Sequence, residues 1–318
     1  MSFESLTPDI IVTAVEQACG LPMTGLAIAL PSYINRVYEV RAKDGTKLIA
    51  KFYRHNRWTS QAIMDEHQFL LDCAMAEVPV VAPIKLTNGT TLFSNDTMNL
   101  AVFPKRAGRQ LEICDESYWP RIGSLLARMH LCGEKNSAAH RVTISPTQSA
   151  LNDVEFLCHD IIPEPLKAAY FNTAKKILDF GTPLFADLEC IRIHGDCHCG
   201  NILDRLDEGL QLIDFDDMAM GPPVQDLWLL LPERAANARY EIDLFIEGYQ
   251  RFRKFDRAGL AVIETLRAMR MIYFCAWCSR QTDDFQFKTR YPDWGTGTFW
   301  QRETNDLREQ LGFILDAI

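Results

Sequence analysis

The chain has 318 residues, 47% of them hydrophobic, so it can bury a sizeable core, and its length suits two lobes better than one compact unit. Its 33 lysine and arginine residues stand against 42 acidic residues, which gives a formal net charge of −9. This acidic balance argues against broad electrostatic capture of nucleic acid or of an anionic membrane.

The first hundred residues are predicted to be mostly sheet. Thr7-Pro8-Asp9 begins a short helix with an N-cap, a proline in the first turn and an acid near the positive helix end, and Gly20 ends it. β-favouring residues on both sides of Lys43-Asp44-Gly45 indicate a hairpin of strands over 36–40 and 47–53. A long helix is expected over 59–76, and further strands over 78–83, 90–93 and 99–103.

Beyond Pro104 the pattern becomes helical. Apolar residues at three-to-four spacing predict helices over 118–131, 166–180, 227–231, 240–255 and 264–278. One β-rich island interrupts them, over 191–193, 202–203 and 210–215. The simplest fold is therefore an α+β chain with a small β-rich lobe over 1–105 and a larger, mainly helical lobe over 106–318.

The island carries the motif with the clearest chemistry, His194-x-Asp196-x-x-x-x-Asn201, followed after an apolar hairpin by Asp214. Phosphoryl transfer to a hydroxyl needs a carboxylate that orients and deprotonates the acceptor, and oxygen ligands that hold Mg²⁺ on the phosphates. Asp196 can be the carboxylate, and Asn201 with Asp214 the metal ligands. A tight loop and the end of a buried strand would bring the three together, and the pattern predicts an ATP- and Mg²⁺-dependent kinase.

The alternative is that these residues only make turns, because Gly-Asp and Gly-Asn are common in loops. The ordered set of a histidine, a base, a ligand five residues on and an acid after the hairpin favours the functional interpretation. His194 is expected to anchor the loop by hydrogen bonds. His198 could touch a phosphate when protonated, or be an ordinary loop histidine.

Lys51 lies in a strand that reads as buried, where an ammonium needs an anionic partner. Glu66 falls on the apolar stripe of the following helix, so a Lys51–Glu66 pair is expected to hold the lysine against the ATP α- and β-phosphates. The alternative is a lysine and a glutamate that both reach solvent. Adenine is expected to bind the backbone near Phe103 to Lys105.

No glycine-rich phosphate loop occurs before this strand. The segment Leu30-Pro31-Ser32-Tyr33-Ile34-Asn35-Arg36 stands in its place. The Ser32 hydroxyl and the backbone N–H groups from Ser32 to Asn35 could cap the phosphates.

Ten cysteines are scattered along the chain, and most are expected to be small buried hydrophobic residues. Cys275-Ala-Trp-Cys278 has redox-motif spacing but lies in a predicted helix. Cys190, Cys197 and Cys199 with the nearby histidines suggest zinc, yet their spacing does not fit a zinc knuckle. We expect neither thiol chemistry nor zinc.

Together these residues resemble the aminoglycoside phosphotransferase and choline kinase-like superfamily, whose motif is similar to His194-Gly-Asp196-x-His198-x-Gly200-Asn201. More closely, the chain is similar to the bacterial stress response kinase A family. The matching segments are Ser32-Tyr33, Asn35-Arg36-Val37-Tyr38, Lys51-Phe52-Tyr53-Arg54, Arg57-Trp58, Glu66-His67-Gln68-Phe69, Val78-Pro79-Val80, Ala101-Val102-Phe103-Pro104, Gly108-Arg109-Gln110, Gln225-Asp226-Leu227-Trp228 and Leu266-Arg267-Ala268-Met269-Arg270.

The resemblance implies a protein kinase-like fold and a serine/threonine kinase in stress survival, with Asp196 as proton acceptor and Ser32 helping to bind ATP. Asp226 matches a buried acid that braces the catalytic loop. The chain departs from ordinary protein kinases in three respects. Asp214-Phe215-Asp216 lacks the usual third glycine, and Gly221-Pro222-Pro223 follows too soon to leave room for a long activation loop. His198 replaces a lysine that is common at this place in protein kinases.

The acceptor of the phosphate is left open. It could be serine or threonine of a protein, including the kinase itself, or a small amine or alcohol bound by aromatic residues among Tyr273, Phe274, Trp277, Tyr291, Trp294 and Trp300, unless these only pack in a core. A pseudokinase scaffold is the non-enzyme alternative. The start lacks the charge of a secretory signal and no stretch approaches about 18 apolar residues, so we expect a cytoplasmic monomer without a membrane segment.

Overall fold

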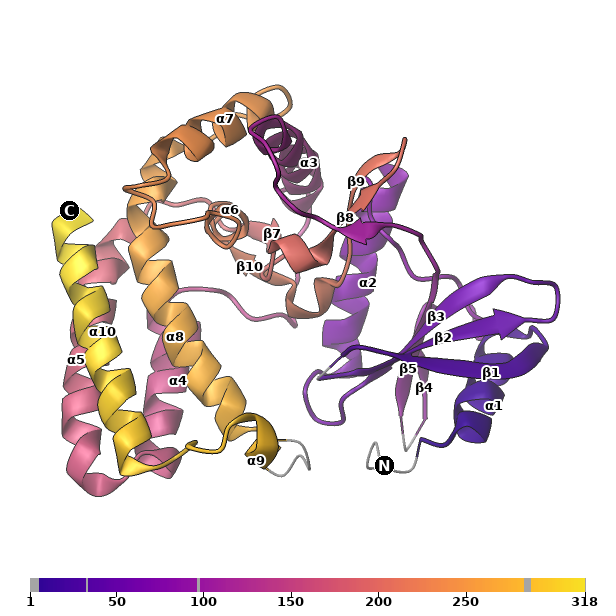
Figure 1. The fold of residues 1–318 in the computed structure, drawn as a ribbon, viewed down its shortest axis with the longest axis horizontal. Coiled ribbons are helices and arrows are strands. Elements are labelled where there is room, and N and C mark those ends of the chain that lie inside the picture. The colour runs from indigo at the N-terminus through magenta and orange to yellow at the C-terminus, as the bar shows by residue number, and fades with distance from the viewer. Residues whose placement is uncertain (1–5, 33, 96–97, 283–286, 318) are drawn as a thin grey trace.

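The computed structural model describes residues 6–32, 34–95, 98–282 and 287–317. Its N-terminal part is an antiparallel sheet in the order β1-β2-β3-β5-β4 (Figure 1). The strands are β1 (Met23–Leu30), β2 (Arg36–Ala42), β3 (Lys47–Tyr53), β4 (Phe93–Ser94) and β5 (Asn99–Pro104). Helix α1 (Pro8–Cys19) and helix α2 (Ser60–Met75) belong to the same lobe.

The alternation of side chains along β3 separates two environments. Leu48, Ala50 and Phe52 pack with α1 residues such as Val15 in one core cluster. The intervening side chains face the other way, and Tyr53 packs with Ile63 of α2. Because successive strand residues point to opposite faces, Lys51 also lies on the α2 side.

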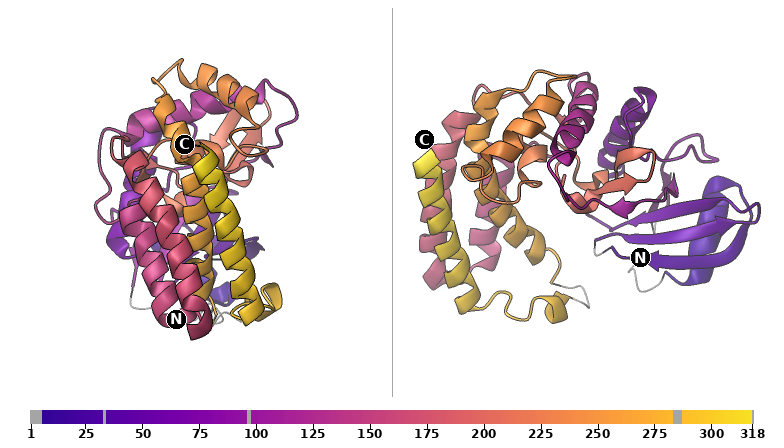
Figure 2. Two further views of the ribbon diagram at one scale, coloured as in Figure 1. Left: turned by 90° about the vertical axis from the view of Figure 1, so that its left-hand side faces the viewer. Right: turned by 45° about the horizontal axis from the view of Figure 1, so that its top comes forward.

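The C-terminal part is mainly helical. Its helices are α3 (Tyr118–Gly133), α4 (Leu151–Phe156), α5 (Glu164–Phe185), α6 (Gln225–Trp228), α7 (Arg239–Tyr249), α8 (Ile263–Ser279), α9 (Phe287–Arg290) and α10 (Gly297–Ala317). Figure 2 shows α5, α8 and α10 side by side, away from the sheet, and contacts between all three pairs agree with that view. None of the described helices is long and apolar enough to cross a membrane.

Short strands lie between the sheet and the helices (Figure 1). They are β6 (Arg109–Gln110), β7 (Ile191–Ile193), β8 (Ile202–Arg205), β9 (Gly209–Leu212) and β10 (Ala219–Gly221). Strands β8 and β9 form the expected hairpin, and β7 pairs with β10. These strands end in the loops that carry the predicted motif.

The predicted α+β, two-lobed kinase-like fold is confirmed, because an antiparallel sheet precedes a helical C-terminal part. The boundary between 105 and 106 stays a prediction, although β5 ends at Pro104. The strand predicted over 78–83 was wrong, since only Val80 makes an isolated bridge there. Strand β1 and helix α10 were missed.

Candidate active site

A hollow of about 730 Å³ lies between the sheet and the helical part. That volume is within the usual range for a bound small molecule. Apolar side chains from both lobes line part of it, namely Leu30, Val37, Ile49, Val81, Phe103, Leu203 and Ile213. Charged side chains from β3, α2, the loop after β7 and the loop after β9 also line it, so the cleft combines apolar and ionic surfaces.

The loop after β7 is held by a buried acid. Asp226, fully buried in α6, accepts hydrogen bonds from the backbone N–H groups of His194 and Gly195, both at 2.8 Å. Its Oδ2 also lies 3.0 Å from Nε2 of His130. Gly195 has φ +82°, a left-handed conformation that suits glycine. These hydrogen bonds give the predicted bracing role of Asp226 a geometric basis. The loop that they hold places Asp196 in the cleft.

His194 ties this loop to the hairpin. Its Nε2 lies 2.9 Å from the carbonyl oxygen of Ile213, the last residue before Asp214. Its ring also packs on that of Phe215, with 4.5 Å between centroids. His194 is completely buried and does not line the cleft, which fits the expected anchoring role.

Asp196 lines the cleft between two basic side chains. Its Oδ1 lies 2.7 Å from Nη2 of Arg270, and its Oδ2 lies 3.6 Å from Nε2 of His198. Burial by itself raises the pKa of Asp196, but the hydrogen bond from His198 and the charge of Arg270 outweigh it, so the pKa falls well below its usual range. The carboxylate is therefore ionised at neutral pH.

Asn201 and Asp214 are brought together by the hairpin. The N–H of Ile213 donates to the carbonyl oxygen of Asn201 at 3.0 Å, and the Asn201 side chain donates to the carbonyl oxygen of Asp196 at 2.9 Å. Asp214 adopts a left-handed backbone conformation, φ 58° and ψ 69°, that aspartate tolerates better than most residues. These contacts thus hold Asp196, Asn201 and Asp214 close to one another.

These residues fit a magnesium ion bound partly through nucleotide. Oδ2 of Asp214 and the amide oxygen of Asn201 accept no hydrogen bond within the described part of the chain. No three His, Cys, Asp or Glu side chains there could hold a metal by themselves. Magnesium in kinases usually takes only one or two protein oxygens and completes its shell with phosphates and water.

Lys51 is buried among three carboxylates. Its Nζ lies 3.5 Å from Glu66, 3.3 Å from Asp214 and 3.1 Å from Asp216. Burial alone lowers the pKa of Lys51, but Asp216 and Glu66 outweigh it and the pKa is raised, so the ammonium keeps its charge. The predicted Lys51–Glu66 pair is present, and Asp216 is a nearer partner that the sequence had not suggested.

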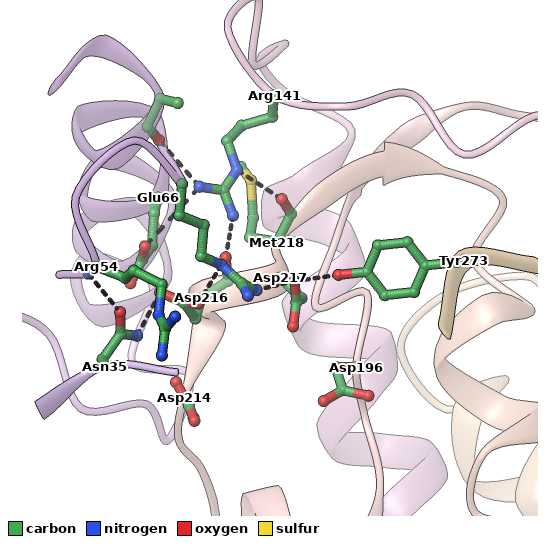
Figure 3. A network of polar contacts seen from close by, with 12 residues as sticks. Asn35, Arg54, Glu66, Arg141, Asp196, Asp214, Asp216, Asp217, Met218 and Tyr273 are labelled. Atoms are coloured by element: carbon green, nitrogen blue, oxygen red, sulfur yellow. Dashed lines mark hydrogen bonds and ion pairs between the residues drawn. The ribbon is translucent and has the colours of Figure 1, made fainter. Parts of the chain in front are cut away.

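Two arginines hold the turn after Asp214. Arg57 contacts Asp216 at 3.1 Å and Asp217 at 2.6 Å. Arg141 donates to the carbonyl oxygens of Asp216 and Met218, the latter at 2.7 Å, and to that of Ala62 in α2. Figure 3 shows Asp216 and Asp217 within these contacts, with Asp214 and Asp196 below them in this view. The turn is thereby fixed to both lobes.

The segment between β1 and β2 meets the same network. Asn35 is buried, donates to Asp216 at 3.0 Å and accepts from the backbone N–H of Arg54 at 3.1 Å. The buried Asn35 side chain therefore fixes the conformation of the predicted phosphate-binding segment. Ser32 is half-buried and lines the cleft, as its predicted role requires. Tyr33 lies outside the described residues.

Phe103 and Lys105, near which adenine is expected, both line the cleft. The N–H of Lys105 already donates to the carbonyl oxygen of Lys47 at 3.1 Å, so a contact with adenine there would use the Lys105 carbonyl oxygen. The Lys105 ammonium pairs with Glu39. Among the aromatic candidates, Tyr273, Phe274 and Trp277 line the cleft, whereas Trp300 is fully buried beside Trp294.

A model of the phosphotransferase enzyme family matches residues 27–263. Stress response kinase A of Escherichia coli K12 is 39% identical over 97% of this chain and 94% of its own length. The chain belongs to the stress response kinase A group of the phosphotransferase enzyme family. The serine/threonine protein kinase RdoA of Salmonella typhimurium, a second member of this group, is 37% identical over 98% of the chain and 95% of its own length.

The fold of this phosphotransferase family recurs in a more distant solved structure. An amicoumacin kinase in complex with AMP-PNP and Ca²⁺ has a TM-score of 0.76 and 16% identity, covering 98% of this chain and 96% of its own. That likeness concerns the fold alone. The family assignment makes the chain a phosphotransferase of the kinase class.

Several side chains of this phosphotransferase site were not assigned from the sequence, namely Arg57, Arg141, Asp216, Asp217 and Arg270. Two signals were present in the sequence. Arg57 and Arg270 fall in segments that resemble the family, and Asp216 takes the place of a glycine. Arg141 had no signal in the sequence. It follows a run of exposed residues, and its burial depends on contacts with segments that are distant in sequence.

Proposed function

We propose that the chain is a cytoplasmic protein serine/threonine kinase of a bacterial stress response, which uses ATP and Mg²⁺ and also phosphorylates itself. The observation that carries this proposal is the placement of Lys51 and Asp196 in one cleft that apolar side chains also line. The relatives support the two finer parts of the proposal, because one is named a stress response kinase and the other a serine/threonine protein kinase.

Each predicted residue has a role in this proposal. Lys51 binds the α- and β-phosphates of ATP and is held by Glu66. Asn201 and Asp214 would hold Mg²⁺, which neutralises phosphate charge when it is bound. Ser32 and the backbone of 32–35 cover the phosphates, and His198 supports Asp196.

Asp196 orients the acceptor hydroxyl. Its carboxylate is ionised at neutral pH, and each carboxylate oxygen can accept more than one hydrogen bond, so a hydroxyl can bind while Arg270 stays in place. In the transfer, the bond between the γ-phosphorus and the bridging oxygen of ATP breaks, and that oxygen keeps the electron pair as ADP leaves. The hydroxyl oxygen bonds to phosphorus, and its proton passes to Asp196.

A small-molecule kinase is the second candidate. Tyr273, Phe274 and Trp277 form an aromatic wall of the cleft, with Phe274 and Trp277 stacked at 5.8 Å, and such a wall can bind an amine or an alcohol. The amicoumacin kinase of similar fold is named for a small molecule. A nucleotide-binding pseudokinase is a third candidate, and a turnover measurement distinguishes it.

The test is transfer of label from γ-labelled ATP in the presence of Mg²⁺. The pure chain is incubated first alone and then with a heat-inactivated bacterial protein extract and its small-molecule fraction, kept separate. Label on protein bands, released as phosphoserine or phosphothreonine by acid hydrolysis, supports the proposal. Label only in the small-molecule fraction supports the second candidate, and no label in any fraction supports a pseudokinase.

A further inference from the structure

The guanidinium of Arg270 has more hydrogen-bond donors than its contacts within the site use. Its single partner within the described residues is Oδ1 of Asp196, at 2.7 Å, and its side chain is 37% exposed. A guanidinium carries five N–H donors in a rigid fork. Most of them are therefore available to a ligand beside the candidate base.

The position of Arg270 places these donors in the cleft, next to the candidate base Asp196. Arg270 lines both the large cleft and a neighbouring hollow of about 100 Å³. One turn further along α8, the hydroxyl of Tyr273 lies 3.3 Å from Asp217. Helix α8 thus contacts the loop after β7 through Arg270 and the turn after Asp214 through Tyr273, whereas Lys51 on β3 is held by three carboxylates.

Phosphoryl transfer needs positive charge close to the phosphoryl group, beside the base that binds the acceptor hydroxyl. Negative charge spreads over the three equatorial oxygens of the phosphoryl group as it moves toward the acceptor. A protein kinase commonly has a lysine two residues after the base, where this chain has His198. An imidazole is not permanently charged as a guanidinium is, and Nδ1 of His198 accepts a hydrogen bond from the Gly200 N–H at 3.0 Å.

We propose that Arg270 is a catalytic residue whose guanidinium binds the phosphoryl group during its transfer, and so supplies the charge that the lysine supplies elsewhere. This inference rests on the proposed function. An acceptor hydroxyl bound to Asp196 would lie about 2.6–3.2 Å from it and about 3–3.5 Å from the phosphorus. A guanidinium on the same carboxylate therefore reaches the phosphoryl oxygens. Bonds and protons change as in the transfer described above, and Arg270 keeps its own protons.

A competing role is that Arg270 only orients Asp196. The two roles differ when Asp196 is removed. If Arg270 binds the phosphoryl group directly, its replacement still matters in an Asp196→Asn background, whereas an orienting residue loses its effect there. Affinity for ADP with aluminium fluoride and Mg²⁺, which together mimic the phosphoryl group in transfer, gives a readout that needs no turnover.

The experiment compares Arg270→Gln, Arg270→Lys and the double variant Arg270→Gln/Asp196→Asn with the full-length chain. Arg267→Gln is the matched control, because Arg267 lies one turn away on α8 and contacts Glu264 at 3.5 Å rather than the cleft. Transfer of label to the chain itself, release of phosphate to water, and affinities for ADP with and without aluminium fluoride are measured. Melting temperature checks the fold of each variant.

We expect Arg270→Gln to lower kcat by roughly 100- to 1,000-fold, as the loss of one transition-state donor does elsewhere. Affinity for ADP alone stays within about twofold, whereas affinity for ADP with aluminium fluoride falls at least about tenfold, in both backgrounds. Arg270→Lys keeps the charge and restores part of the loss. Should Arg270→Gln fail to fold, Arg270→Lys provides the same comparison, with a smaller expected loss.

Two results would overturn the proposal while leaving the proposed function intact. One is unchanged affinity of Arg270→Gln for ADP with aluminium fluoride. The other is loss of the Arg270 effect in the Asp196→Asn background. If the unmodified chain transfers no label at all, the proposed function fails and the role of Arg270 fails with it.

Discussion

The Lys51 ammonium lies 3.1 Å from Asp216 and 3.5 Å from Glu66, so the aspartate in the loop after β9 is the nearer of its two buried partners. Asp216 stands where protein kinases have a glycine. Its carboxylate also contacts Arg57 and Asn35. A single side chain from the helical lobe therefore links three side chains of the sheet lobe.

Replacing Asp216 with asparagine should destabilise the protein strongly. The change leaves Lys51 and Arg57 buried with less negative charge around them, and breaking a buried ion pair from one side costs about 3–5 kcal/mol. Urea unfolding measures the change in the free energy of unfolding. Asp243→Asn is the control, since Asp243 forms an exposed pair with Arg257 and should change stability by less than about 1 kcal/mol. Equal effects of the two changes would show that the buried pairing contributes little.

Gly195→Ala should disrupt the catalytic loop. A Cβ at Gly195 would lie 2.1 Å from the backbone carbonyl oxygen of Asp217, and the residue has φ +82°. Gly25 is a matched control, because its φ is +86° and a Cβ there would meet nothing within 4 Å. We expect Gly25→Ala to cost about 1–2 kcal/mol from backbone strain alone, and Gly195→Ala to cost more and to abolish turnover. Similar stability and activity in the two variants would contradict the close approach of the two loops.

His67 should make the fold sensitive to acid. It is completely buried between Tyr53, at 3.0 Å, and Thr91, at 2.8 Å. Burial first, and then the positive charges of Lys51 and Arg141, lower its pKa from 6.5 to about 3. Below pH 6.5 the unfolded chain binds a proton that the folded chain does not, so stability falls as the pH drops from 6.5 toward 3.

The expected contribution of His67 at pH 5 is a loss of about 2 kcal/mol relative to pH 7.5. Urea unfolding at the two pH values measures it. His67→Gln should show a smaller loss between the two pH values than the unmodified chain, whatever its stability at pH 7.5. An unchanged pH dependence in His67→Gln would rule out this assignment.

Activity should depend on Mg²⁺ that Asp214 and Asn201 help to bind. Excess EDTA should abolish transfer of label, and added Mg²⁺ should restore it. Asp214→Asn removes a charged oxygen that would bind the ion, so we expect the Mg²⁺ concentration for half-maximal activity to rise about tenfold or more, equivalent to about 1.4 kcal/mol. Asp207→Asn, in the turn of the β8–β9 hairpin, is the control and should leave the Mg²⁺ requirement unchanged. Full activity in EDTA would contradict the metal assignment.

Much of the fold could be predicted because local signals agreed with it. Thr7 caps α1 with its hydroxyl, and Gly20 ends the helix in a left-handed conformation, as their residue types suggest. Strand β1 was missed because most of its residues are exposed or half-buried, so it lacks a clear alternation. Helix α10 was missed as well, although it is one of the longest in the chain. Val78–Pro83 looked like a strand from its β-branched residues, yet its prolines cannot donate to a ladder.

In the candidate site too, local sequence patterns predicted some contacts and missed others. Asp196, Asn201 and Asp214 lie close in sequence, so their meeting needed only one hairpin to form. Lys51 and Glu66 followed from the periods of a strand and a helix. Arg270 and Asp196 are 74 positions apart, and their contact depends on the packing of α8, which no local pattern reports.

The most direct test of the account is a single-turnover measurement of label transfer from γ-labelled ATP by the unmodified chain and by Asp196→Asn. We predict that Asp196→Asn binds ATP with unchanged affinity but transfers label about 100- to 10,000-fold more slowly, because the acceptor hydroxyl is no longer oriented by a carboxylate. Equal transfer rates for the two proteins would contradict the assignment of Asp196, and with it the site built around that residue.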